Sequence, residues 1–117
     1  MTHQRAYQLD VDVSRVGPAA VVKVRGSAGM NEADLLQAEL SQLADEPKGL
    51  IVVDMEGLEF ICSAGLGALV NAHLKSRDRD GQIRLVKPQA RVLKILEATR
   101  LDTLFGIFAD LDEAITA

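Results

Sequence analysis

The chain has almost none of the residue types on which several classes of protein depend. Among its 117 residues there is one cysteine, Cys62, and no tryptophan, and aromatic residues make up 3% of the total. A single cysteine cannot form an internal disulfide or build a zinc site alone. The scarcity of aromatic side chains argues against a platform that stacks bases or sugars. One cysteine also fits a reducing compartment, so we expect a cytoplasmic protein.

Long apolar runs are absent as well. No stretch approaches the roughly eighteen apolar residues of a membrane helix, and the N-terminus MTHQRAYQLDVDV does not resemble a signal peptide. Thirteen Lys and Arg against seventeen Asp and Glu leave a net charge of −4, which disfavours a protein that coats nucleic acid or an anionic membrane. We therefore expect neither nucleic-acid binding nor membrane insertion, and the length predicts a single domain over residues 1–117.

Basic residues are concentrated in one part of the chain. Residues 75–100 contain 8 basic and 3 acidic side chains. Lys75, Arg77 and Arg79 are placed to end a helix, where cations stabilise the helix dipole. An acidic partner or a nucleotide is the alternative interpretation of this stretch.

Hydrophobic periodicity predicts five strands. Apolar and polar residues alternate over 7–13, and a β-branched run covers 20–24, so with Gly17-Pro18 as the turn they predict an N-terminal hairpin ending at Gly26. The continuous apolar run at 50–54 is typical of a strand buried on both faces. Two further strands are predicted at 83–86 and 104–108.

Helices are predicted between these strands. One should begin with Asn31 as its N-cap, one near Ser63, and one with Pro88 in its first turn. A closing helix over 112–116 should be capped by Asp110. The resulting order, ββαβαβαβα, predicts an α/β domain whose small, mixed and mostly parallel sheet is flanked by about four helices.

The most informative segment joins the central strand to the second helix, where Ser63 follows a short predicted loop. Serine is a common N-cap, and this structural role is one interpretation. The other is that free amides and the positive helix end make a tolerant place for a phosphate on the serine. Gly65 and Gly67 should weaken a helix and would let a partner's backbone come close, which favours a recognition surface.

At this turn the chain resembles a known family. The run Phe60-Ile61-Cys62-Ser63-Ala64-Gly65-Leu66-Gly67 resembles the signature of STAS domains, specifically the small stand-alone anti-anti-sigma factors, or anti-sigma factor antagonists. Three further stretches are similar to other parts of the family pattern, in the same order along the chain: 22–26, 50–55, and 96–105 followed by 112–114.

The resemblance implies a binding module in a partner-switching circuit. Such a protein binds an anti-sigma factor and frees a sigma factor. The anti-sigma factor is commonly a serine kinase that uses ATP and Mg²⁺, and it phosphorylates the serine that corresponds to Ser63; a PP2C-type phosphatase reverses this. No cofactor or metal belongs to the antagonist itself. The partner-binding surface implied here comprises Gly29, Met30, Asn31, Cys62, Ser63, Ala64, Gly65, Leu66 and Gly67.

Two positions depart from the pattern of phosphorylated family members. They usually carry an acidic residue directly before the serine, where this chain has Cys62, and an Asp three residues after the glycine of the second strand, where it has Gly29. Both acids are associated with the surface that faces the kinase. The alternative function is therefore a STAS-type scaffold or sensor module that binds a protein partner without being phosphorylated.

Enzyme activity is the less favoured interpretation, and no catalytic residue is assigned. A serine-hydrolase elbow needs glycine where this chain has Ile61. The available bases are His3, near the terminus, and His73, which lies several turns along the helix that Ser63 begins and is interpreted as a core-edge residue.

Three further groups of residues around the turn are interpreted as having no catalytic or ligand-binding role. Asp54, Glu56 and Glu59 are expected to be solvated carboxylates around a tight loop, not metal ligands or an acid–base pair. The Gly65–Gly67 turn lacks the lysine and spacing of a phosphate-binding loop. Cys62 beside a helix N-terminus could sense oxidants, but a small residue in a strand-to-helix turn is the simpler interpretation.

Overall fold

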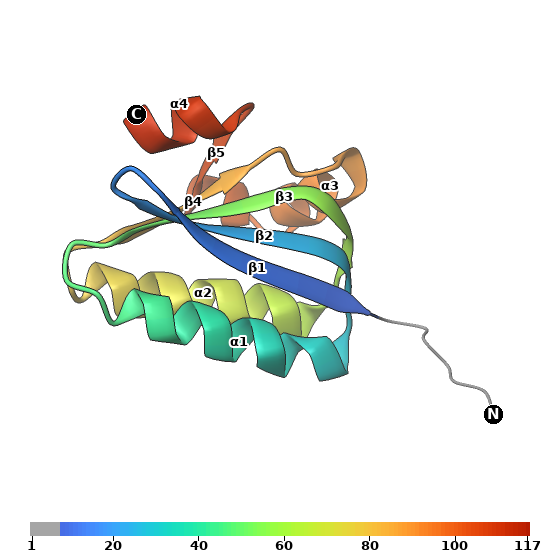
Figure 1. The fold of residues 1–117 in the computed structure, drawn as a ribbon. Coiled ribbons are helices and arrows are strands. Elements are labelled where there is room, and N and C mark those ends of the chain that lie inside the picture. The colour runs from blue at the N-terminus through green and yellow to red at the C-terminus, as the bar shows by residue number, and fades with distance from the viewer. Residues whose placement is uncertain (1–7) are drawn as a thin grey trace.

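One five-stranded sheet organises the protein, for which a computed structural model describes residues 8–117 (Figure 1). Its strands lie side by side in chain order. The first two are antiparallel and all other neighbours are parallel. The strands are β1 (Leu9–Val16), β2 (Ala19–Ala28), β3 (Leu50–Ile61), β4 (Gln82–Val86) and β5 (Gly106–Phe108).

Helices connect the parallel strands and close the chain. Figure 1 shows the first two helices side by side beneath the sheet and the last one above it. The helices are α1 (Met30–Ala44), α2 (Ser63–Arg77), α3 (Ala90–Ala98), the short 3₁₀ helix η1 (Leu101–Thr103) and α4 (Leu111–Thr116). This arrangement confirms the predicted α/β class and element order, with η1 added between α3 and β5.

The two faces of the sheet bury separate apolar clusters, because alternate residues of a strand point to opposite faces. Ile51 and Val53 of β3 belong to the larger cluster, which also takes side chains from α1, α2 and α3. Val52, between them, belongs to a smaller cluster that includes Ala114 of α4. Residues 51–53 are each at most 1% exposed, which confirms the prediction of a strand buried on both faces.

The hairpin and the C-terminal cap follow their predicted turn chemistry. Gly17, between β1 and β2, has φ +57°, a left-handed conformation that glycine adopts without a Cβ clash. At the other end of the chain, the Asp110 carboxylate accepts a 2.8 Å hydrogen bond from the Glu113 amide. Asp110 is therefore the N-cap of α4, as predicted.

Several predicted boundaries were wrong. Asn31 lies inside α1, whose N-cap is Gly29, and Pro88 precedes α3, whose N-cap is Gln89. The second strand continues past Gly26 to Ala28, and residues 104–105 are not part of β5. The predicted contributions of Tyr7 and His3 fall outside the described residues.

The largest difference concerns β3, which extends through the segment predicted as a tight loop. Asp54, Glu56 and Glu59 all lie within this strand. The pairing of β2 with β3 shifts register twice in this half, as β-bulges do. Gly57 lies opposite Arg25 there, and a Cβ at position 57 would come within 2.6 Å of the Arg25 Cγ. A side chain at position 57 would therefore clash with the aliphatic part of the Arg25 side chain on the neighbouring strand, and glycine avoids this clash.

Candidate functional site

The N-termini of α1 and α2 lie next to each other at one edge of the sheet. Ala28 at the end of β2 pairs with Ile61 at the end of β3, and the Cys62 amide donates a 2.9 Å hydrogen bond to the Ala28 carbonyl. Helix α1 begins two residues after Ala28, and α2 begins two residues after Ile61. Parallel pairing thus brings the 29–31 and 62–67 segments together, although residues 32–61 separate them in the sequence.

Ser63 presents a free hydroxyl at this edge. It is exposed and is the first residue of α2, whereas the N-cap is Cys62 with extended backbone and no side-chain capping bond. The interpretation of Ser63 as an N-cap was therefore wrong. Across residues 8–117 its hydroxyl makes no hydrogen bond, and the first turn of α2 contains no acidic residue. An added anion there would meet free amides and an uncompensated helix dipole.

The two glycines of this helix have different structural roles. A Cβ on Gly65 would lie 2.7 Å from the Ile61 Cγ1 and 3.7 Å from the Ala28 Cβ, so close packing of α2 on the strand ends requires a glycine. A Cβ on Gly67 would meet nothing within 4 Å. Helix packing therefore explains Gly65, contrary to the expectation that both glycines serve recognition. No such contact explains Gly67.

The remaining predicted surface residues divide by exposure. Met30 is 72% exposed, which is high for a large apolar side chain in a protein of this kind. Asn31 and Ala64 are exposed beside it, whereas Gly29 and Leu66 are buried. We call the exposed and partly exposed residues the helix-end surface: Met30, Asn31, Cys62, Ser63, Ala64 and Gly67.

His73 lies away from this surface and is 3% exposed. Its ring contacts that of Phe105 edge to face, with centroids 5.1 Å apart. Burial, together with the nearby Arg77 charge, lowers the pKa of His73 from its ordinary value of 6.5. The structure thus places His73 at the edge of the core, as predicted.

The lowered pKa predicts a pH-dependent stability. Because the folded state disfavours the imidazolium, the unfolded state binds more protons as the pH falls below about 6.5. The free energy of unfolding should therefore fall between about pH 7.5 and about pH 5.5, and a His73→Gln variant should lose less over the same range. Thermal unfolding of both proteins at matched ionic strength measures the difference. Equal losses would show that other groups titrate.

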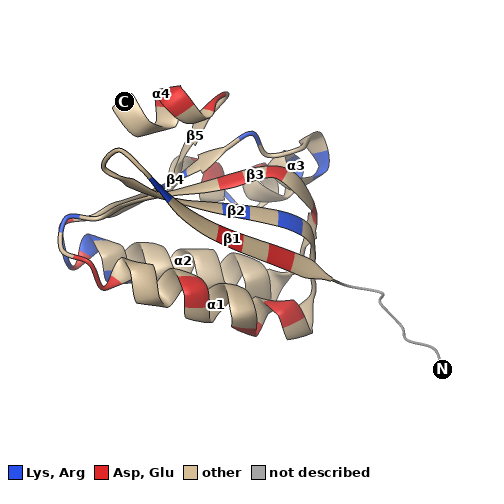
Figure 2. Cartoon of the chain, in the orientation of Figure 1, with Lys and Arg blue, Asp and Glu red and all other residues tan. Residues whose placement is uncertain are grey.

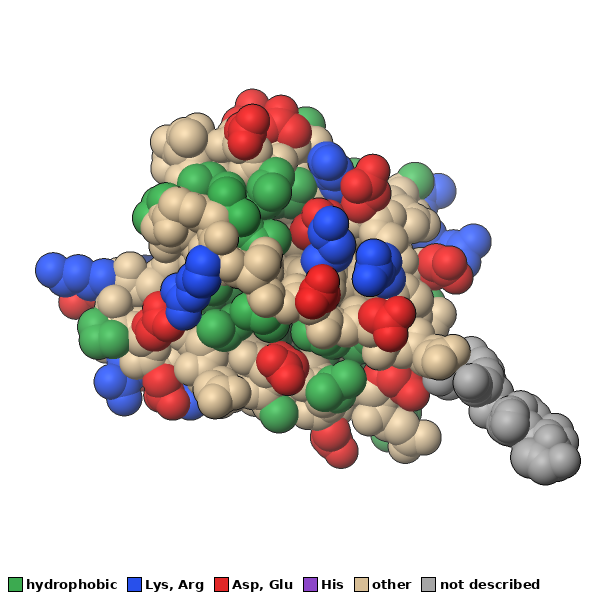
Figure 3. All heavy atoms as spheres, viewed as in Figure 1, with side chains coloured by type: hydrophobic (Ala, Val, Ile, Leu, Met, Phe, Trp, Pro, Cys, Tyr) green, Lys and Arg blue, Asp and Glu red, His purple; other side chains and the backbone are tan. Residues whose placement is uncertain are grey.

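A second polar region lies on the same face of the sheet as α4, on the part that α4 does not cover. The sequence analysis did not single it out. Figure 2 shows two acidic positions of β1 beside two basic positions of β2, and Figure 3 shows these charged side chains gathered over the strands. The pairing explains the pattern, since Asp10 lies opposite Arg25 and Asp12 opposite Lys23. The sequence did carry a signal for this region, because the charged residues of each strand are spaced two residues apart and therefore share one face.

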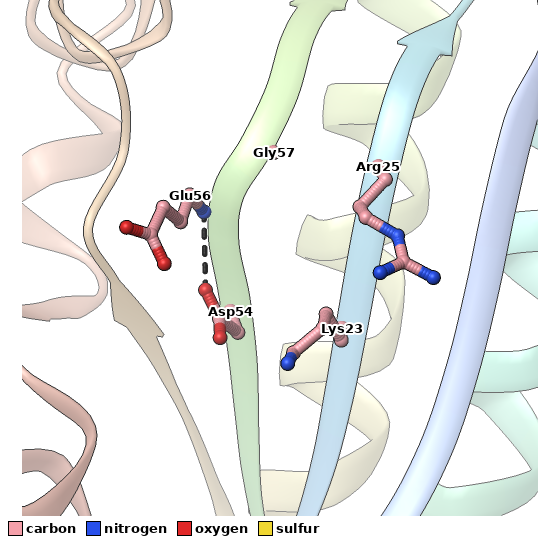
Figure 4. A pocket seen from close by; sticks show the side chains of 5 residues that line it. All are labelled: Lys23, Arg25, Asp54, Glu56 and Gly57. Carbon is pink, nitrogen blue, oxygen red and sulfur yellow. Dashed lines mark hydrogen bonds between the residues drawn. The ribbon is translucent and has the colours of Figure 1, made fainter.

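A shallow cavity of about 180 Å³ lies within this region (Figure 4). It is lined by Lys23, Arg25, Asp54, Glu56 and Gly57. Asp54 is 6% exposed, and its carboxylate accepts a 3.1 Å hydrogen bond from the Glu56 amide. Lys87 pairs with Glu56 at 3.6 Å. The expectation that Asp54 is a solvated carboxylate was therefore wrong, because it is buried in β3 and hydrogen-bonded. Charges of both signs line the cavity.

Residues 8–117 contain no group of three or more His, Cys, Asp or Glu residues that could hold a metal ion. No helix among them is long and apolar enough to cross a membrane.

Comparisons with known proteins agree with this architecture. The STAS domain family model matches residues 10–114. An anti-sigma factor antagonist from Mycobacterium paratuberculosis has a similar structure, with a TM-score of 0.81, 27% identity, and coverage of 93% of this chain and 92% of that one. The unphosphorylated form of the anti-sigma factor antagonist SpoIIAA gives a TM-score of 0.77 at 20% identity, covering 91% and 93% of the two chains.

One curated relative is similar over almost its whole length. BtrV of Bordetella bronchiseptica, whose name assigns it to the anti-sigma factor antagonists, is 21% identical over 109 residues, which are 93% of this chain and 94% of BtrV. The structure combines a small mixed sheet with a serine at the start of its second helix. With the family model matching most of its length, the chain belongs to the STAS domain family.

Proposed function

We propose that this protein is a cytoplasmic, non-enzymatic anti-sigma factor antagonist that binds an anti-sigma factor through the helix-end surface and so releases a sigma factor. Phosphorylation of Ser63 switches it off. The observation that carries the proposal is the free, exposed Ser63 hydroxyl at the N-terminus of α2. Gly67, which no internal contact requires, lies one turn further along the same helix.

The proposed phosphorylation needs only the Ser63 hydroxyl from the antagonist itself. In the proposed step the Ser63 oxygen takes the γ-phosphoryl group of ATP held with Mg²⁺ by the kinase, a base of the kinase takes the hydroxyl proton, and ADP leaves. A PP2C-type phosphatase returns the hydroxyl by hydrolysis of the phosphoserine. The exposed position of Ser63 supports access by both enzymes, and relatives named as antagonists support the class of partner.

An alternative function is a STAS-type scaffold or sensor that binds a protein partner without being phosphorylated. The observation that favours it is the absence of an acid at the two positions noted above, where Cys62 precedes the serine and Gly29 caps α1. The two functions share a surface and differ in whether Ser63 is modified. Incubation with candidate partner kinases and ATP, followed by mass spectrometry, distinguishes them.

The first variant to test is Ser63→Ala. The hydroxyl caps nothing, so the variant should fold with a free energy of unfolding within about 0.5 kcal/mol of the parent, as for a typical surface substitution. It should keep binding the anti-sigma factor and release sigma constitutively in the presence of kinase and ATP. Calorimetric binding and a sigma-release assay measure both. Loss of all partner binding by a folded Ser63→Ala would contradict the switch.

Cys62→Asp should raise the rate of Ser63 phosphorylation severalfold. Cys62 occupies the N-cap with extended backbone and no capping bond, and Asp is a favoured N-cap that adds about 1 kcal/mol of stability there. Its charge also restores the acid that similar proteins carry. Initial rates with a single kinase test this.

The matched control for this experiment is Cys62→Asn. Asn caps a helix about as well as Asp but carries no charge. A faster rate for Asp than for Asn would assign the effect to the charge. Equal rates for Asp, Asn and the parent would show that the acid is not what this pair of proteins lacks.

A further inference from the structure

A second cavity lies at the opposite end of α2 from Ser63. Its volume is about 290 Å³, and it opens between the last turns of α2 and the first residues of β4 and β5. Its polar lining comes from His73, Arg77 and Gln82, and its apolar lining from Ile83 and Leu104. Among the described residues, no carboxylate lines it. The cavity therefore offers donors and positive charge beside apolar surface.

His73 is the unusual group in this lining. Its Nδ1 is completely buried without a hydrogen-bond partner, and within residues 8–117 neither ring nitrogen makes a hydrogen bond. Buried polar atoms nearly always have a partner, so each exception needs a reason. His73 also lines the cavity, so its imidazole ring lies beside any ligand bound there.

Arg77 is the second unpaired group. Its neighbours on the same helix end, Lys75 and Arg79, lie 3.1 and 3.7 Å from the Asp45 carboxylate. Arg77 has no such partner among residues 8–117. Arg77 lines the cavity, and its charge disfavours the imidazolium of His73.

We propose that this cavity binds a small monocarboxylate with a short aliphatic chain. The guanidinium of Arg77 matches a carboxylate in charge and in paired N–H donors, and the imidazole and the Gln82 amide can donate further hydrogen bonds. Ile83, 2% exposed, and Leu104 then contact the aliphatic chain. The volume lies at the small end of ligand sites, which suits a ligand of a few carbon atoms.

Sodium butyrate is the probe for this site. Titrated into the full chain against sodium chloride at matched ionic strength, it should shift the amide resonances of Gly81, Gln82 and Gly106 along saturable curves. Butanol, which lacks the charge, and butylammonium, which reverses it, should bind at least about tenfold more weakly, the value of one charge-assisted hydrogen bond. Non-saturating butyrate shifts, or equal binding of butylammonium, would overturn the proposal.

Variants separate the site from general charge effects. Arg77→Gln should weaken butyrate binding by about tenfold or more. Arg79→Gln removes the same charge two residues away, outside the cavity, and should keep the affinity within about twofold. His73→Gln tests the imidazole, with thermal unfolding as its check on folding. Equal weakening by Arg77→Gln and Arg79→Gln would reduce the effect to long-range charge and refute the site.

Discussion

Phosphorylation of Ser63 is expected to weaken binding of the anti-sigma factor by at least about a hundredfold while leaving the antagonist folded. A phosphoserine brings roughly −1.5 to −2 charges and three acceptor oxygens. On the antagonist side these meet the free amides and positive end of α2, whose own first turn contains no acidic residue, and the local stabilisation is about 0.3–1 kcal/mol. The fold therefore tolerates the group.

For the partner, binding next to the same phosphate is unfavourable. Apart from Asn31, the residues of the helix-end surface around Ser63 are small or apolar, such as Ala64 and Met30. A hydrated dianion buried against a surface shaped for a hydroxyl should cost several kcal/mol, and each 1.4 kcal/mol is about a tenfold change in affinity. The effect belongs to the interface and not to the fold.

Calorimetric binding of both forms to the anti-sigma factor measures this change, with thermal unfolding in parallel. Ser63→Ala is the control that cannot be phosphorylated and should respond to neither kinase nor ATP. A phosphorylated form that binds as well as the parent contradicts the mechanism. One that binds poorly because it has unfolded would place the switch in the fold.

Alanine at positions 65 and 67 should change stability in opposite directions. Gly65→Ala forces a methyl against the stiff, branched side chain of Ile61, 2.7 Å away, and overpacking of this kind costs about 1–3 kcal/mol. Gly67→Ala meets open space and removes a helix-destabilising glycine, so it should add up to about 1 kcal/mol. Urea unfolding of the two variants measures both changes.

The same pair separates folding from recognition. If Gly67 keeps the helix-end surface open for a partner's backbone, the more stable Gly67→Ala should bind the anti-sigma factor about tenfold more weakly. Gly65→Ala should bind in proportion to its folded fraction. A Gly67→Ala protein that is more stable and binds normally would remove Gly67 from the interface.

Local patterns predicted most of the fold because most elements follow one period. The strand at 50–54 was predicted because its residues form a continuous apolar run, which is typical of a strand buried on both faces. The second half of β3 was missed for a physical reason. After Met55 the buried positions are Leu58 and Ile61, a spacing of three produced by the shifted pairing with β2, so the period of two is lost.

The site divides in a similar way. Ser63 could be singled out from the sequence because it follows a buried strand and begins a helix. The packing role of Gly65 could not, because its contacts with Ile61 and Ala28 depend on how α2 docks on two strand ends. The unpartnered ring of His73 also follows only from tertiary packing.

The strand order described above leaves β1 and β5 as the two margins of the sheet within the described residues. A margin with free backbone groups is a template on which further strands add, the first step toward fibrils. Here β1 carries the outward charges Asp10, Asp12 and Arg15, and β5 is three residues long. Charge and brevity both discourage such addition. The helix-end surface can thus be free for the proposed partner without the sheets of separate molecules joining edge to edge.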